Sequence, residues 1–136
     1  MSTHSRKIKI VEFTLEGNSF ECQVKNWKIV NGTGDGERFY AQCPDGEFFE
    51  DAEPEYSLEL EFFADWRLSG VSDYLVSNDQ ETVAFQLDHH PDVAAEHVRW
   101  TGDVKVKAPD VGGENRTTEM TTVTLPIIGK PVYSRP

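Results

Sequence analysis

The chain has 136 residues, a hydrophobic share of 38% and a formal net charge of −11, which fits one domain with one core. Because nucleic-acid binders gain most of their affinity from Lys and Arg, this charge argues against a protein that grips DNA or RNA. No apolar run approaches the roughly 20 residues of a membrane span, and the N-terminus lacks an apolar signal segment. We therefore expect no membrane partner and synthesis in a cytoplasm.

The first part of the chain predicts a β-hairpin. Residues 7–15 are rich in alternating apolar types, which indicates a strand. Glu16-Gly17-Asn18 favours a tight turn, so residues 19–30 are expected to return as the partner strand. A small thiol in an alternating pattern behaves as a buried hydrophobe. The residues expected to face inward in the partner strand are Phe20, Cys22 and Val24.

Residues 31–56 change in character, because glycines, prolines and turn dipeptides replace the alternating pattern. This composition predicts a long loop or extended arm. Loops of this length are uncommon inside compact domains and usually have a task, so the segment is the best candidate for contact between subunits. The alternative is that its aromatic side chains fold back over their own domain. Five aromatic residues of this segment are costly to leave in water and are the candidate interface: Phe39, Tyr40, Phe48, Phe49 and Tyr56.

The rest of the chain predicts further strands and one short helix. Residues 68–77 carry apolar side chains at helical spacing, with Ser69 or Ser72 as a possible N-cap and Asn78 as a stop. The last strand is expected to end at Gly129-Lys130-Pro131. The sum is a mainly β fold, a β-sandwich or partly closed barrel with one short helix and a long acidic loop, in a single domain over residues 1–136. The further strands are predicted over residues 57–63, 82–88, 98–108 and 117–128.

No motif specifies an active site. The sharpest metal candidate is residues 88–92 with His97 nearby, but neighbouring histidines on a strand point to opposite faces and cannot easily share an ion. The glycines of residues 32–36 are not followed by the lysine and helix of a phosphate-binding loop, and no nucleophile elbow is present. We therefore expect no catalytic residue, no bound metal, no cofactor and no enzymatic activity.

Acidic residues are dense between residues 45 and 61, where no Lys or Arg interrupts them. Like charges at this density resist packing against each other. They are expected to face solvent, a basic patch on a neighbouring subunit, or a water-filled channel. The residues of this acidic patch are Asp45, Glu47, Glu50, Asp51, Glu53, Glu55, Glu59 and Glu61.

Several loose motifs resemble the major tail proteins, or tail tube proteins, of long-tailed bacteriophages. They are Trp100-Thr101-Gly102-Asp103-Val104-Lys105-Val106, the turn Val111-Gly112-Gly113-Glu114 and residues 121–131. They occur together with an early hairpin, a long acidic loop and a single helix. The resemblance spans most of the chain as an order of elements. We expect no appended outer domain, which would be a departure from many tail proteins.

This resemblance implies a virion protein that assembles with itself into stacked rings of six, forming a hollow tail tube through which DNA passes without specific binding. The acidic wall would repel DNA and let it pass. The implied partners are other copies of the chain, a tape measure protein and a tail terminator, and the implied location is the virion tail, with assembly in the host cytoplasm. Alternatives are another ring-forming virion part, such as a tail terminator, head–tail connector or decoration protein. A further alternative is a monomeric β-sandwich binding module whose aromatic platform is Trp27, Trp66 and Trp100.

Overall fold

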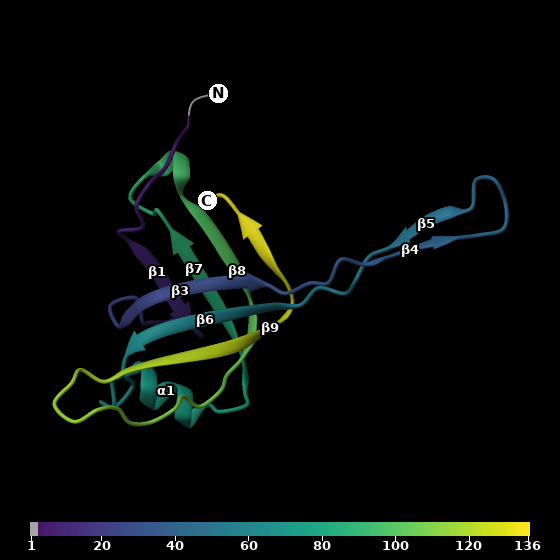
Figure 1. Ribbon diagram of the computed structural model, residues 1–136. Coiled ribbons are helices and arrows are strands. Elements are labelled where there is room, and N and C mark those ends of the chain that lie inside the picture. The colour runs from purple at the N-terminus through teal and green to yellow at the C-terminus, as the bar shows by residue number, and fades with distance from the viewer. Residues whose placement is uncertain (1–2) are drawn as a thin grey trace.

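The computed structural model describes residues 3–136, which form a curled, antiparallel seven-stranded sheet with the shape of a half-barrel (Figure 1). This confirms the predicted mainly β fold and partly closed barrel. The spatial order of the strands is β2, β1, β7, β8, β9, β6 and β3. Their bounds are β1 Val11–Leu15, β2 Asn18–Ser19, β3 Val24–Asn31, β6 Tyr56–Phe63, β7 Thr82–His89, β8 Val98–Lys105 and β9 Met120–Ser134.

Strand β9 turns the corner of the half-barrel. Its first half pairs with β6 and its second half pairs with β8. Between these halves Gly129 has a φ of +75°, which a residue without a Cβ adopts at no steric cost. The register with β8 shifts at the same point, between Thr101 and Asp103. The prediction that this strand ends at residues 129–131 was wrong, because the chain bends there and continues the ladder to Ser134.

The core lies on the inner face of the sheet, where alternate residues of the strands are buried. Leu58, Leu60 and Phe62 of β6 are each at most 1% exposed, as their alternation predicted. Helix α1, Val71–Ser77, lies across one end of the half-barrel (Figure 1). It buries Val71, Tyr74 and Leu75 against the core.

The predicted helix was right in kind but began too early. Its N-cap is Gly70, and neither expected serine serves in that role. Ser69 has a positive φ of 66°, while the Ser72 hydroxyl accepts a hydrogen bond from the Asp65 backbone N–H at 3.2 Å. Asn78 ends the helix as predicted, with its own backbone N–H bonded to the Tyr74 carbonyl oxygen.

The predicted first hairpin was wrong beyond its turn. Only β2 returns along β1, and β3 pairs with β6 instead. A turn at residues 21–23 interrupts the alternation, since the Gln23 N–H donates to the Phe20 carbonyl at 3.0 Å. Phe20 is buried as expected, but this turn leaves the Cys22 thiol exposed rather than in the core.

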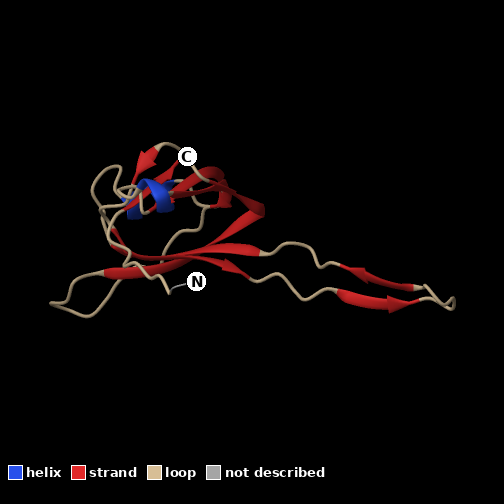
Figure 2. Ribbon diagram, turned by 90° about the horizontal axis from the view of Figure 1, so that it is seen from above, coloured by secondary structure: helices blue, strands red, loops and turns tan. Residues whose placement is uncertain are grey.

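Residues 32–55 leave the half-barrel as a long two-stranded arm (Figure 2). Strand β4, Glu37–Tyr40, pairs with β5, Glu47–Glu50, in a small sheet separate from the main one. The arm extends away from the body in both ribbon views and does not fold back over it. Of the two interpretations of this segment, the extended arm therefore matches the structure, and its outer part is a regular hairpin.

Candidate assembly site

The arm is fastened to the body by a short ladder at its base. The Gly32 N–H donates to the Glu55 carbonyl oxygen at 2.7 Å. The Glu55 N–H donates in turn to the Thr33 hydroxyl at 3.0 Å, and the Thr33 N–H donates to the Asn31 side-chain oxygen at 3.1 Å. These bonds bring the two chains of the arm together where they leave β3 and β6, so the arm has a defined starting direction.

Aromatic side chains hold the outer hairpin together. Phe39 and Phe48 lie opposite each other in the register and stack with ring centroids 5.2 Å apart, an arrangement that stabilises cross-strand pairs. On the other face, Phe49 covers Gly36, where an added Cβ would lie 2.8 Å from the phenyl ring. The Arg38 guanidinium pairs with the Glu47 carboxylate on that same face. Both faces of the hairpin thus carry aromatic and charged groups.

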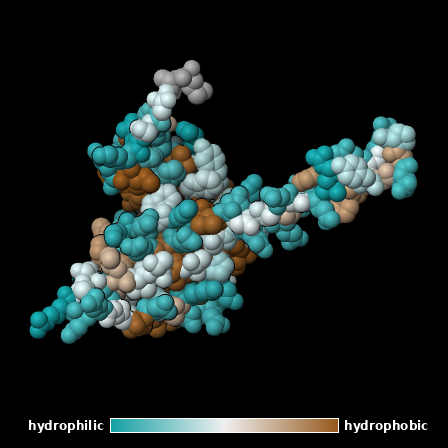
Figure 3. Space-filling model, in the orientation of Figure 1, coloured by the Kyte–Doolittle hydropathy of each residue, from teal (hydrophilic) through white to brown (hydrophobic). Residues whose placement is uncertain are grey.

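These rings remain open to solvent. Tyr40 is 72% exposed, Phe48 is 56% exposed and Phe49 is 52% exposed, and Figure 3 shows the arm as a narrow extension in which apolar residues lie among hydrophilic ones. The structure therefore gathers four of the five predicted interface residues on one hairpin. Tyr56 is the exception, since it begins β6 and packs against the core of the half-barrel.

The predicted acidic patch divides into two parts. Glu59 and Glu61 project from the outer face of β6, where lysines of β3 accompany them. Lys28 lies opposite Glu59 in the register, and the Lys25 ammonium lies 3.4 Å from a Glu61 carboxylate oxygen. Bases that are distant in sequence therefore offset this part of the patch. The other members lie on the arm: Asp45, Glu47, Glu50, Asp51, Glu53 and Glu55.

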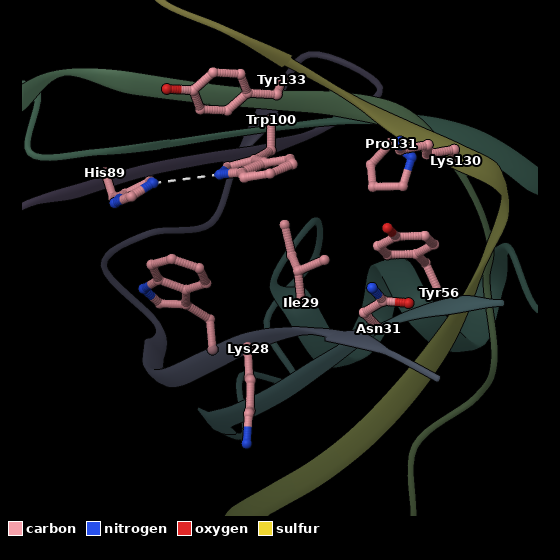
Figure 4. A pocket seen from close by; sticks show the side chains of 10 residues that line it. Lys28, Ile29, Asn31, Tyr56, His89, Trp100, Lys130, Pro131 and Tyr133 are labelled. Atoms are coloured by element: carbon pink, nitrogen blue, oxygen red, sulfur yellow. Dashed lines mark hydrogen bonds between the residues drawn. The ribbon is translucent and has the colours of Figure 1, made fainter. Parts of the chain in front are cut away.

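An open cavity of about 820 Å³ lies between β3 and β6 on one side and β7, β8 and β9 on the other. We call it the aromatic cavity. Figure 4 shows the side chains of Ile29, Tyr56 and Trp100 directed into the shared space. The Trp100 and Tyr133 ring centroids are 5.1 Å apart. The apolar and aromatic residues of its lining are Trp27, Ile29, Tyr56, Trp100, Pro131 and Tyr133.

His89 forms the polar floor of the aromatic cavity. The Trp100 indole N–H donates to His89 Nε2 at 3.3 Å, and the Trp27 ring lies 5.5 Å from the imidazole. Burial, reinforced by the neighbouring His90, lowers the pKa of His89. The imidazole is thus held neutral, with Nε2 as an acceptor. Of the three tryptophans expected to form a platform, two meet here, while Trp66 lies elsewhere and bonds to Glu119.

A buried ion cluster lies on the outer face beside this floor. Asp88 is 0% exposed and accepts two hydrogen bonds from the Arg99 guanidinium, at 2.9 and 3.0 Å. A third bond joins it to His97 at 3.1 Å. Burial alone would raise the pKa of Asp88, but the bonds from Arg99 and His97 outweigh it and hold the pKa below its usual value. The residues of the predicted metal candidate are thus divided between two faces: Asp88 and His97 bond to each other on the outer face, whereas His89 accepts its bond from Trp100 in the cavity.

Sequence reasoning missed the aromatic cavity, although it named two of its tryptophans. His89 was weighed only as a metal ligand, and Tyr133 lay beyond the predicted end of the last strand. Continued alternation from Val132 to Ser134 was the one available signal for Tyr133, since it extends the strand pattern past Pro131. The convergence of five strands on one space is a property of topology and has no local signature.

No protein-family model matches the chain, and no curated protein matches it. Within residues 3–136, no helix has the length and apolar composition needed to cross a lipid bilayer. Function must therefore be inferred from the residues and their geometry.

Proposed function

We propose that this chain is a structural subunit that assembles with copies of itself into stacked rings, forming a tube like the tail tube of long-tailed bacteriophages. The observation that carries the proposal is the arm. It extends away from the body and exposes aromatic rings on both of its faces. Large exposed apolar groups gathered on one extension are typical of a protein interaction site.

The low stability expected of an isolated hairpin also supports contact between copies. An isolated two-stranded hairpin is at best marginally stable in water, and β4 and β5 contact mainly each other. Glu37 also lies directly opposite Glu50 in the register, a like-charge pair that weakens the ladder. A partner surface that buries the exposed rings would supply the missing stability.

The open edges of the main sheet offer a second means of assembly. Strand β3 ends the order of the seven-stranded sheet on one side, and β2, with only two residues, ends it on the other. Uncovered edges present unpaired backbone groups that can pair with another chain. Contacts between different surfaces of neighbouring copies close into rings or continue as an open stack. Both outcomes are needed for a tube of stacked rings.

The charge of the chain fits a conduit for DNA. With a net charge of −11, a lumen lined by this protein would repel the phosphate backbone and let DNA pass without adhering. On this proposal the protein resides in the virion tail and meets a tape measure protein and a tail terminator. Reversal to lysine of the six members of the predicted acidic patch that lie on the arm, Asp45, Glu47, Glu50, Asp51, Glu53 and Glu55, tests the electrostatic part. DNA ejection should slow if these acids line the lumen, and normal ejection would count against that placement.

Electron microscopy of the purified full-length chain at high concentration, with light scattering for mass, tests the assembly. We expect hollow tubes or stacked rings, whereas a terminator, connector or decoration protein would stop at one ring. The double substitution Phe48→Ser and Phe49→Ser should abolish polymerisation and leave the fold intact. Phe63→Ser is the control, because this ring on the body is 42% exposed. A wild-type chain that stays monomeric even when seeded with tail tips would refute the proposal.

The aromatic cavity favours one competing function, a monomeric module that binds a small ligand. Its volume of about 820 Å³ and its aromatic lining with few polar groups are usual for ligand sites. A monomeric wild-type chain that binds aromatic compounds, with quenching of the cavity tryptophans, would support this alternative. The exposed aromatic arm has no role in it, and for this reason we prefer the assembly.

A further inference from the structure

The aromatic cavity and the arm have opposite chemical character. No carboxylate belongs to the described lining of the cavity, although the chain has 24 acidic residues. Lys130 is the lining base that the contact uses, since the Lys28 side chain points away from the cavity (Figure 4). Lys130 sits beside Pro131 at the bend of β9, and it is an exposed residue of the cavity lining. Between residues 32 and 55 the arm has Arg38 as its one base against eight acids: Asp35, Glu37, Asp45, Glu47, Glu50, Asp51, Glu53 and Glu55.

The two surfaces also match in shape and in apolar content. The cavity is open and lined by indole, phenol and aliphatic groups on several strands. The arm is a slender ribbon with the stacked pair of Phe39 and Phe48 on one face. Their rings stand out from the hairpin with carboxylates beside them at Glu37 and Glu50. A ribbon of this kind can place its rings in an aromatic cavity and keep its carboxylates at a basic rim.

The direction of the arm excludes docking within one chain. Asn31, the last residue of β3, and Tyr56, the first residue of β6, line the cavity and flank the arm. From this point the arm extends outward, so that its hairpin lies far from its own cavity (Figure 1). Each chain therefore carries one aromatic projection and one aromatic recess that cannot meet each other. A second copy supplies the missing partner for each of them.

We propose that the aromatic cavity of one copy receives the β4–β5 hairpin of the next, with Phe39 and Phe48 against Trp27 and Trp100. This proposal rests on the proposed function and names the surface that the arm contacts. The contact is heterologous, so it propagates from copy to copy and consumes one arm and one cavity at each step. The carboxylates of the arm lie near Lys130 of the receiving copy, where they also assist encounter between the acidic chains.

Complementation between two full-length variants tests this arrangement. The arm variant carries Phe39→Ser and Phe48→Ser and keeps its cavity. The cavity variant carries Lys130→Glu and Tyr133→Ser, both at exposed positions, and keeps its arm. Each variant alone should stay monomeric at concentrations where the wild type polymerises. An equimolar mixture should form a dimer and stop, because only one intact arm meets one intact cavity.

Three readouts make the result decisive. Circular dichroism and thermal unfolding should show that both variants are folded. The milder Lys130→Glu change alone should raise the critical concentration for assembly about tenfold or more, as the loss of one good interfacial contact does, while the control Lys107→Glu should leave it unchanged. In a Trp66→Phe background, assembly should protect Trp27 and Trp100 from acrylamide quenching.

The outcomes separate this inference from the proposed function. If the cavity variant polymerises like the wild type, the arm docks elsewhere and the inference fails while the tube proposal stands. Two folded, monomeric variants whose mixture stays monomeric would likewise overturn the inference. If the wild-type chain does not assemble even when seeded, the proposed function itself fails. Dimers in the mixture with protected tryptophans would establish the docking.

Discussion

The substitution Asp88→Asn probes the buried ion cluster on the outer face of the half-barrel. The carboxylate is 0% exposed and accepts bonds from two basic side chains. The Asn side chain has the same shape and keeps one acceptor oxygen, but its NH2 group would face Arg99 or His97 in place of the second oxygen. Loss of one member of a buried ion pair costs about 3–5 kcal/mol. The Arg99 side chain is 34% exposed and that of His97 is 19% exposed, so water can partly replace their lost bonds. We therefore expect the substitution to lower the free energy of unfolding by about 2 kcal/mol at pH 7.

The cost of Asp88→Asn should depend on pH. Because the pKa of Asp88 is held below its usual value of 3.8, the folded state binds fewer protons than the unfolded state. The contribution of the carboxylate is therefore complete above the unfolded pKa and is lost as pH falls through the lower folded pKa. The difference in stability between wild type and variant should be constant from neutral pH to about pH 5 and shrink below about pH 4.

Urea unfolding of the full-length chain across this pH range measures the effect. Asp92→Asn is the matched control, since it removes an exposed carboxylate from the same turn region. The control should change the free energy of unfolding by less than about 0.5 kcal/mol. A difference between wild type and Asp88→Asn that persists unchanged at low pH, or that is absent at pH 7, would refute the role of the ionised carboxylate.

Other changes test the core, the arm and the cavity. Leu60→Ala should lower the free energy of unfolding, measured with urea, by about 2–5 kcal/mol. A decrease of less than about 1 kcal/mol would contradict full burial of Leu60. Tyr74→Phe should cost about 1 kcal/mol in the same assay, through one lost hydrogen bond. Gly36→Ala places a Cβ against Phe49 at a φ of +81°, so light scattering should show weaker assembly with an unchanged melting temperature of the body. Because the pKa of His89 is lowered, the folded state resists protonation, and the wild type should lose stability below about pH 6.5 while His89→Gln loses less in thermal unfolding.

Strand alternation carried most of the fold prediction. Leu58, Leu60 and Phe62 repeat with period two, and Val83 and Phe85 do the same in β7; all five are buried. A strand with one wet face must place its apolar residues at every second position, so the pattern and the burial have the same cause. The partly closed barrel followed from the number of such segments and the single short helix.

The first hairpin was predicted wrongly because the alternation of apolar residues continues where the strand pairing changes. Phe20, Cys22 and Val24 keep the period of two through a turn, so the sequence shows no break where the chain reverses. The true partner of β3 is β6, across the whole length of the arm. Pairing over such a separation depends on how other strands fill the sheet, which one local pattern does not contain. The exposed Cys22 is a direct consequence of this hidden turn.

Only part of the candidate assembly site was predictable, because composition identifies a segment but not the contacts that it makes. Composition identified the arm, because glycines and prolines over such a length exclude a core element. The stacking of Phe39 on Phe48 was not visible, since it depends on the register set by the turn at residues 42–45. The sequence did not show that the acidic patch divides, because Lys25 and Lys28 come to Glu61 and Glu59 from another strand.

The acidic residues and the aromatic residues of the arm have opposite effects on the stability of its hairpin. Glu37 faces Glu50 directly across the hairpin, so charge repulsion opposes the ladder that the stack of Phe39 on Phe48 supports. In a free chain these two effects oppose each other, and a two-stranded hairpin without further partners is at best marginally stable. A recess with aromatic walls and Lys130 at its rim would strengthen the stack and relieve the repulsion together. On the proposed docking, formation of the hairpin and formation of the contact would be coupled, so the arm would become more ordered when it binds a second copy.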